Sequence, residues 1–588
     1  MGIITAVALA LLWHISPPWS KVTNSAMVTV AGNTPLALSE ATFINHTNPT
    51  QTIDVVVGLK LRNETDLNRL LERQSDPTSP DFRQFITPAQ FLSTFSPTQN
   101  SVDKVVAHLK KQGLDVLEVT PNRLLVHVRG TVAQVEKTFA VRINVYEIGS
   151  RRLYSNDTDP SVPADIADVV ESISGLNNIA VYHSRMQKTA RPHSVGPAGF
   201  GVSDIATAYN YPTASNTGRA NAAGTTYTGK GVTVAIATAN TYQLSDIEAY
   251  WKQYGVNRTG TVTNVNVNGT ATDLEGETTL DLQQVSSQAP GADVIMYLGM
   301  DPSFNSFALV FNQIVTDNKA SVATVSWGLC EKNSGIAQMK TEHVLFKQGA
   351  AQGIAFFAAA GDDGAYDCQP TKGKHVASVD YPSSDPFVTA VGGTALEINA
   401  DGSRKSETAW TGAGGGVSDR YDRPFWQIGP GIPLNGLRNT SDVALVADPN
   451  TGYSIFFQGQ WDSAGGTSFA SPAWAGLWAD ATEAYGGRLG PASPTVYRIA
   501  RSKDYGTVFY DVRSGNNGNG NGPGFKAGKG WDHPTGWGSP NGVKLIEWLL
   551  QEKATPQAPG QPTQFPASQQ GNVIPEHVIR VQGKGILY

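Results

Sequence analysis

The chain has 588 residues, and single hydrophobic cores stop growing at roughly 250–300 residues, so at least two folded units are expected. Charged residues make up only 16% of the sequence, which is typical of a globular protein and excludes a highly charged disordered chain. The net charge of −6 and the lack of a basic run argue against a nucleic-acid partner.

The first twenty residues contain an apolar stretch, 3–15, which is shorter than the roughly 20 residues that a membrane-spanning helix needs. Such a stretch is typical of a signal peptide, so residues 1–20 are predicted to be one and the protein to be secreted, with no membrane partner. A basic start and a clear A-x-A cleavage site are missing, so a misassigned start codon or an amphipathic end that docks on the body remain alternatives.

The next segment, residues 36–183, is predicted to form a small α+β unit. Its short runs 53–61 and 123–130 alternate apolar and polar residues, which is typical of strands. Residues 101–113 lie between them and place their valines and leucines at helical spacing. Residues 184–198 are basic, contain two prolines and have no apolar periodicity, which indicates a linker open to proteolysis.

A second unit is predicted over residues 199–550. It contains short, continuously apolar runs of the kind found in strands buried on both faces, separated by helix-length segments. These runs are 231–238, 292–298, 321–327, 354–361 and 387–393. The pattern predicts an α/β domain with a mostly parallel sheet, whose active site lies at the carboxyl ends of the strands. The tail, residues 551–588, is rich in Pro and Gln and is expected to be a linker or disordered.

Two cysteines, Cys330 and Cys368, are too few for a zinc site or a disulfide scaffold. In an exported chain the pair could form one bridge, which would contribute between about 3 and 4.7 kcal/mol if unstrained. Two free buried thiols are the alternative.

Ser468 is the candidate nucleophile. It ends the run Gly-Gly-Thr-Ser, which predicts a tight turn, and an apolar stretch that predicts a helix follows it. A serine at a helix N-terminus lies among oriented N–H groups that favour developing negative charge. An ordinary helix-capping serine would look the same by position alone. The context G-T-S-x-x-x-P, however, resembles the nucleophile segment of the subtilisin clan.

An ordinary subtilisin needs a histidine base, and none of the ten histidines stands in the HGT setting that such an enzyme uses. Glu277 and Asp281 offer another base, because their i, i+4 spacing places both carboxylates on one helix face. Two acids this close share a proton, and paired carboxylates can accept one from serine. A solvated acidic helix face is the alternative, although apolar residues flank the pair.

Asp362 directly follows the apolar run 354–361, so it is expected at the carboxyl end of a buried strand. A protonated acid there could donate a hydrogen bond to an oxyanion, whereas an ionised one would repel it. An acidic working pH follows from this assignment. A Gly-Asp-Asp-Gly turn alone is weak support, because Asp and Gly form turns in general.

The ordered motifs E-x-x-x-D, S-W-G, G-D-D-G and G-G-T-S together resemble the sedolisin family of serine-carboxyl peptidases. The resemblance implies a subtilisin-like peptidase domain behind a ferredoxin-like, pro-kumamolisin-type activation prodomain that inhibits it. It also implies Ser468 as nucleophile, Glu277 as general base, Asp281 as its orienting partner and Asp362 as oxyanion acid. The enzyme is then expected to be a self-processing zymogen and a monomer, acting as an endopeptidase or as a tripeptidyl-peptidase.

The resemblance further implies one calcium ion near the end of the peptidase domain. Y-D-V and G-K-G-W-D match the family's site, with carboxylates and backbone carbonyls as ligands. The implied ligands are Asp511, Val512, Gly528, Gly530 and Asp532. Some relatives place a further Glu on the first catalytic strand, where this sequence has Thr238.

Peptide or protein substrates are expected to bind in extended form, through strand-like backbone hydrogen bonds. The segments expected to line the cleft are Ser326-Trp327-Gly328 and Gly414-Gly415. Two other functions remain open: a histidine-dependent subtilisin-type protease, for which His343, His375 and His533 lie inside the second unit, and a non-catalytic peptide-binding pseudoenzyme.

Overall fold

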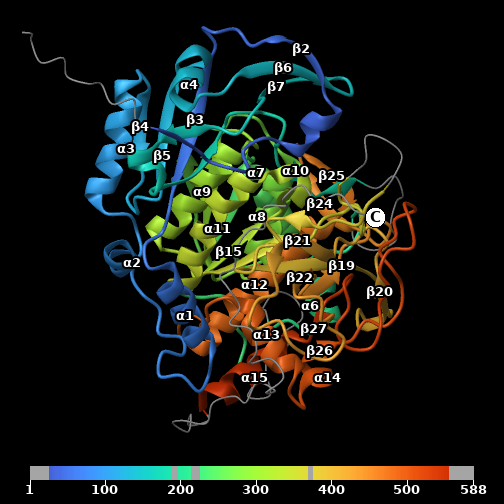
Figure 1. Cartoon of the computed structure of the whole chain (residues 1–588). Coiled ribbons are helices and arrows are strands. Elements are labelled where there is room, and N and C mark those ends of the chain that lie inside the picture. Colours follow the sequence, from blue (N-terminus) through green and yellow to red (C-terminus); the bar gives the residue numbers. More distant parts are fainter. Residues whose placement is uncertain (1–25, 189–196, 213–224, 369–374, 555–588) are drawn as a thin grey trace, which may run out of the picture.

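The computed structural model describes residues 26–188, 197–212, 225–368 and 375–554. The predicted signal peptide, part of the predicted linker and most of the predicted tail lie outside these ranges. The remaining chain forms a large α/β domain, with a smaller unit from the first part of the chain along its top and one side (Figure 1).

The α/β domain is built on an eight-stranded sheet. Its strands, in spatial order, are β13 (Val262–Val267), β14 (Asp293–Gly299), β12 (Thr233–Ala239), β15 (Val322–Val325), β17 (Ala355–Ala359) and β19 (Val388–Ile398), and β19 pairs with both β23 (Val443–Val446) and β20 (Arg404–Ala409). All ladders are parallel except β19–β20, which confirms the mostly parallel sheet.

Helices cover both faces of this sheet because successive side chains of its strands point to opposite faces. In β12, Val234 and Ile236 pack with helices α8 (Gly276–Gln288) and α12 (Thr467–Tyr485). The alternate residues Ala235 and Ala237 pack with α9 (Phe304–Asp317) and α11 (Ile336–Ala351). This two-sided burial explains why the strands are apolar throughout.

The N-terminal unit has the β-α-β-β-α-β order of a ferredoxin-like fold. Its elements are β3 (Thr52–Leu59), α3 (Gln99–Lys111), β4 (Asp115–Val119), β5 (Leu125–Thr131), α4 (Val132–Phe139) and β9 (Val170–Ser174). The four strands form an antiparallel sheet in the order β4-β5-β3-β9. Helices α1 (Glu64–Ser75) and α2 (Pro88–Thr94) are inserted after β3, and a separate sheet joins β2 (Thr42–His46), β6 (Ile143–Ile148) and β7 (Arg151–Asn156).

The remaining elements complete the two units. They are β1 (Met27–Thr29), β8 (Ser161–Pro163), α5 (Ala164–Ala167), β10 (His183–Ser184), β11 (Gln187–Lys188), α6 (Val202–Ala208), α7 (Leu244–Tyr254), β16 (Trp327–Cys330), α10 (Glu331–Ser334), β18 (Asp380–Tyr381), β21 (Gly416–Asp422), β22 (Leu437–Thr440), β24 (Tyr453–Phe457), β25 (Gln460–Gly465), α13 (Ala492–Ala500), α14 (Tyr505–Val508), β26 (Phe509–Tyr510), β27 (Ser539–Pro540) and α15 (Gly542–Ala554), with a 3₁₀ helix at Leu36–Glu40.

The small sheet packs directly on the large domain. In β3, Val55 and Val57 face the core of the N-terminal unit, whereas Val56 faces a cluster that includes Phe311 of α9 and Phe346 of α11. Figure 1 shows α1 and α2 continuing down the side of the large domain. Within the described ranges, no helix is long and apolar enough to cross a membrane.

Candidate active site

The predicted nucleophile and base meet where α8 and α12 pack together. Ser468 lies in the first turn of α12, and its Oγ donates a hydrogen bond of 2.8 Å to Glu277 Oε2 in the first turn of α8. One turn further along α8, Asp281 Oδ1 accepts a hydrogen bond of 2.6 Å from Ser326 Oγ. The i, i+4 spacing therefore directs both carboxylates to the same side of α8, towards Ser468 and Ser326.

Both carboxyl groups are completely buried, and all the remaining residues of α8 are buried too. Burial and the nearby charge of Asp281 raise the pKa of Glu277 well above its usual value, and burial does the same for the pKa of Asp281. Glu277 Oε1 and Asp281 Oδ2 have no hydrogen-bond partner within the described part of the chain. A proton shared by the two groups would remove one of two buried charges that lie one helical turn apart.

Asp362 follows the carboxyl end of β17, as its sequence context predicts. Its Oδ1 accepts hydrogen bonds of 2.8 Å from both the backbone N–H and the Oγ1 of Thr467, the residue before the nucleophile. Its Oδ2 is buried and has no partner among the described residues. Burial raises the pKa of Asp362 to about 7, so the group carries a proton in acid and can donate it in a hydrogen bond.

The chain's own linker crosses this site. His183, the residue before the predicted linker, and Ser184 form β10, which pairs antiparallel with Trp327 and Gly328 of β16. Beyond them Arg185 N–H donates to the Ser326 carbonyl at 3.1 Å. The Ser184 hydroxyl also donates to Glu277 Oε2, the oxygen that accepts from the Ser468 hydroxyl.

The carbonyl of Arg185 lies at Ser468, the predicted nucleophile. It accepts a hydrogen bond of 3.3 Å from the backbone N–H of Ser468. A Cβ added to Gly466 would lie 2.0 Å from this carbonyl oxygen and 2.5 Å from Asp362 Oδ2. Both oxygens therefore lie against the same glycine and leave no room for a side chain there. Gly466 has φ of 116°, which further favours glycine. The Arg185 carbonyl thus lies at an N–H donor and near a protonatable acid, the groups that an oxyanion would need.

After Arg185 the linker continues along the other side of the site. Gln187 and Lys188, as β11, pair antiparallel with Ala464 and Gly465 of β25. Sequence reasoning missed β25 as part of the cleft, because nothing in its local pattern indicates which segment it pairs with. The Gly-Gly that precedes Thr467 is the signal that could have pointed to a backbone contact there.

The predicted cleft segments have different surroundings. Ser326, Trp327 and Gly328 bond the linker backbone. Gly414 instead donates its N–H to the Gly361 carbonyl at 2.8 Å, and the Gly415 carbonyl accepts from the side chain of Asn517. These glycines therefore support the loop that carries Asp362, while their contact with substrate stays a prediction.

Thr238 and the three histidines of the second unit make other contacts. The Thr238 hydroxyl bonds to that of Thr278 at 2.8 Å and accepts from Trp327 Nε1 at 3.0 Å. His343 bonds Asp385 at 2.7 Å, and His533 bonds the Thr440 carbonyl. His375 packs its ring on that of Tyr366. The side chain that bonds the Ser468 hydroxyl is therefore Glu277 and not one of these histidines.

The predicted calcium ligands Asp511 and Asp532 lie in neighbouring loops. Gly530 N–H donates to Asp511 at 3.1 Å, and Gly528 N–H donates to Asp532 at 2.9 Å. Burial, with a contribution from the charge of Asp511, raises the pKa of Asp532 to about 7. Carboxylate oxygens suit a hard cation. The backbone groups that meet Asp511 and Asp532 here are N–H donors and not the predicted carbonyl ligands, so the calcium site stays a prediction. Within the described residues, no group of three or more His, Cys, Asp and Glu side chains could hold a metal ion.

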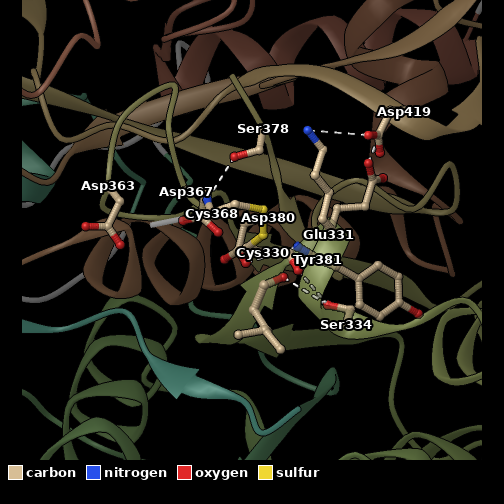
Figure 2. Close-up of a disulfide and its surroundings, with 12 residues drawn as sticks. Cys330, Glu331, Ser334, Asp363, Asp367, Cys368, Ser378, Asp380, Tyr381 and Asp419 are labelled. Atoms are coloured by element: carbon tan, nitrogen blue, oxygen red, sulfur yellow. Dashed lines mark hydrogen bonds and ion pairs between the residues drawn. A yellow bond between two sulfur atoms is a disulfide. The ribbon is translucent and has the colours of Figure 1, made fainter. Parts of the chain in front are cut away.

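Cys330 and Cys368 form a disulfide, so the two-thiol alternative is not what the structure contains. The bridge joins β16, which pairs with the linker, to the loop that starts at Asp362. Figure 2 shows Asp367 and Asp380 beside the bridge, and the pair of Glu331 and Asp419 farther along.

Comparison with known proteins separates the same two units. Residues 39–179 match the family model described as the pro-kumamolisin activation domain, and residues 175–538 match the subtilase family. Sedolisin from Pseudomonas sp. (strain 101) is 34% identical over 534 residues, 85% of this chain and 87% of that protein. Kumamolisin from Bacillus sp. (strain MN-32) is 30% identical over 536 residues, 85% of this chain and 92% of that protein.

More distant relatives and a solved structure agree with this assignment. Tripeptidyl-peptidase 1 from Rattus norvegicus is 26% identical over 543 residues, 86% of this chain and 93% of that protein. One similar solved structure is that of Pseudomonas sedolisin, a serine-carboxyl proteinase, complexed with two molecules of pseudo-iodotyrostatin. It matches with a TM-score of 0.53 and 32% sequence identity, and the match covers 60% of this chain and 98% of the sedolisin chain. The chain is therefore a serine-type peptidase of the sedolisin family, with an activation prodomain in front of a subtilisin-like domain.

Proposed function

We propose that this protein is a secreted, acid-acting serine-carboxyl peptidase, made as a zymogen that cleaves its own linker. The observation that carries the proposal is the linker itself, because its Arg185 carbonyl lies at the N–H of Ser468 in an extended, strand-paired segment. Such pairing is how extended peptides bind to exposed sheet edges. Substrates are proposed to bind along the same two strands, β16 and β25.

In the proposed reaction, Ser468 Oγ attacks the substrate carbonyl carbon while its proton passes to Glu277 Oε2. Asp281, held by Ser326, keeps Glu277 oriented and shares the pair's proton. The developing oxyanion accepts hydrogen bonds from the Ser468 N–H and from protonated Asp362. Glu277 then protonates the leaving amine as the C–N bond breaks. Water resolves the acyl-enzyme through the same base.

The bond proposed for self-cleavage is Arg185–Met186. Acidifying the purified precursor is expected to release a catalytic chain whose first residue is Met186, and mass spectrometry of intact products would identify it before any further trimming. A first cut elsewhere in the chain would show that the linker lies in the cleft only as an inhibitor. No cut, together with no hydrolysis of a denatured protein at acid pH, would favour a peptide-binding pseudoenzyme.

The prodomain is proposed to dissociate as the pH falls because an ion pair that holds it is lost. This pair joins Glu64 in α1 to Lys347 in α11. Burial opposes the Glu64 carboxylate, yet the charge and hydrogen bond of Lys347 hold its pKa below the usual 4.5. The pair therefore stabilises docking above pH 4.5, and this stabilisation is lost as the pH falls through the lowered pKa. Protonation of Glu64 leaves the fully buried Lys347 ammonium unpaired.

Glu64→Gln is accordingly expected to shift the midpoint of precursor activation to a higher pH, because the variant lacks the ion pair at every pH. The rate of precursor disappearance across the acid range measures this midpoint. Glu118→Gln, which removes an exposed carboxylate of the same unit, is the control and should leave the midpoint in place. An unchanged midpoint for Glu64→Gln would assign the acid response to other groups.

Calcium is proposed to bind through Asp511 and Asp532, with the carbonyls of Val512, Gly528 and Gly530. The ion would supply positive charge to two carboxylates, of which Asp511 also pairs with the exposed Arg513. Binding to the folded state alone stabilises by about 2.7 kcal/mol at a hundredfold excess over Kd.

Saturating calcium is therefore expected to raise the melting temperature by several degrees, and a chelator should reverse the rise. Asp532→Asn should lose this dependence, whereas Asp273→Asn, at an exposed position, should keep it. Equal melting temperatures of the native protein in calcium and in chelator would exclude the site.

A further inference from the structure

The side chain of Arg185 fills a closed acidic pocket next to the catalytic residues. Only 7% of Arg185 is exposed. Its Nε and one Nη donate to the two oxygens of Asp380 at 2.8 and 2.7 Å, and the same Nη donates to Asp367 at 3.3 Å. The other Nη lies 3.9 Å from Asp363. Asp367 and Asp380 are themselves buried, so the guanidinium binds to carboxylates inside the protein and not to a cluster of acids on its surface.

The pocket's walls belong to the substrate cleft. Asp380 lies in β18 and is paired with Cys330 of β16, the strand that binds the linker backbone. Asp367 precedes Cys368, so the disulfide fastens the two carboxylate-bearing segments together (Figure 2). A Cβ on Gly328 would come within 2.4 Å of Asp380 Oδ2, so glycine at this position of β16 makes room for the carboxylate.

We propose, on the basis of the peptidase function above, that this pocket selects arginine on the acyl side of the scissile bond in substrates as well as in the linker. Asp380 is the specificity residue, because its two carboxylate oxygens accept two hydrogen bonds from the guanidinium. Asp367 is the second carboxylate, placed by the disulfide. The proposal concerns the substrate side chain and not the bond-breaking chemistry, which Ser468 and Glu277 supply.

Geometry and charge both favour arginine over other side chains. The guanidinium is planar and offers parallel donors to a carboxylate, whereas the lysine ammonium is a point charge that cannot form the fork. A neutral side chain would leave Asp367 and Asp380 buried side by side without a counter-charge. Sites built to bond a buried polar group reject analogues that lack it by about 10⁴–10⁵-fold at the upper end.

The carboxylates that face the guanidinium also link this preference to pH. They are Asp362, Asp363, Asp367 and Asp380, and the guanidinium of Arg185 is the cation among them. Burial raises the pKa of Asp367 and of Asp380, although the charge of Arg185 opposes this rise in both. With no arginine bound, stronger acid therefore neutralises the pocket. The preference for arginine is expected to be larger at about pH 5.5 than at about pH 3.5.

Three peptides that differ only before the scissile bond test the proposal with the mature enzyme: arginine, lysine and citrulline, which has nearly the shape of arginine without its charge. Mass spectrometry of the products confirms the bond that is cut. At about pH 5.5 the kcat/KM for arginine is expected to exceed that for citrulline by at least ~100-fold, with lysine between them. Values within about twofold for arginine and citrulline would overturn the proposal without any variant.

Asp380→Asn is expected to reduce the arginine-to-citrulline ratio at least tenfold, and Glu248→Gln, an exposed carboxylate on α7, should leave that ratio unchanged. An unchanged ratio in Asp380→Asn would remove this residue from specificity and overturn its assignment. Cleavage of all three peptides without preference would overturn only the pocket assignment. No cleavage of any peptide at acid pH would overturn the peptidase function with it.

Discussion

The Ser468→Ala precursor is expected to remain at full length at acidic pH, while the native precursor is processed. The substitution removes the hydroxyl of Ser468, the residue whose backbone N–H bonds the Arg185 carbonyl. Loss of a nucleophile in a catalytic triad costs at least about 10⁴-fold in rate. Denaturing gels and intact mass over a time course at about pH 3–4 measure the effect.

A trans experiment separates self-processing from misfolding. Adding a trace of the mature native enzyme to the Ser468→Ala precursor at acid pH should cut its linker, because the variant keeps the cleavable segment and acid is proposed to release it from the cleft. If the Ser468→Ala precursor alone matured at the native rate, with no trace of another peptidase present, Ser468 would not be the nucleophile.

Glu277→Gln is expected to lower kcat/KM by about 10⁴-fold and to block self-processing. The amide keeps the size of the side chain but cannot accept the proton of Ser468, whose Oγ lies 2.8 Å from Glu277 Oε2. It also ends the proton sharing with Asp281. Steady-state hydrolysis of a peptide that carries arginine before the scissile bond measures the loss.

Glu275→Gln is the matched control, since Glu275 lies two residues earlier and caps α8 by accepting from the Gly276 N–H at 2.9 Å. Weakening a cap costs helix stability of order 1 kcal/mol but leaves the proton acceptor in place. Activity should therefore fall only slightly in this variant. Comparable losses in Glu275→Gln and Glu277→Gln would mean that α8 matters for folding and not for proton transfer.

Much of the fold could be predicted because its signals are local. Strands buried on both faces leave continuous apolar runs, and β12, β14, β17 and β19 arise from the runs that were predicted as strands. The run 321–327 is different, since it divides at Ser326 into β15 and β16. The division follows from long-range contacts: β15 pairs in the parallel sheet, whereas Ser326 bonds Asp281 and Arg185.

The catalytic candidates could be predicted for a similar reason. Ser468, Glu277 and Asp362 lie at or near the ends of helices and strands, and parallel topology brings such ends together at one edge of the sheet.

The acidic pocket could not be predicted from the sequence. Asp367 and Asp380 are thirteen positions apart, their proximity depends on a disulfide and on the pairing of β16 with β18, and no periodicity encodes either. The role of Arg185 depends likewise on the register of the linker in the cleft.

The pH dependence of kcat/KM for the mature enzyme tests the central claim most directly. A base made of two carboxyl groups and an oxyanion acid that must carry its proton predict activity in acid that falls as Asp362 ionises, with a pKa raised by burial to about 7. The account therefore predicts a maximum on the acid side of pH 7 and little activity at pH 8. In stronger acid the activity should fall again, as the Glu277–Asp281 pair, whose pKa values burial raises, takes up its second proton. A profile that rises through pH 6–7 to a neutral or alkaline maximum, as a histidine base gives, would contradict it.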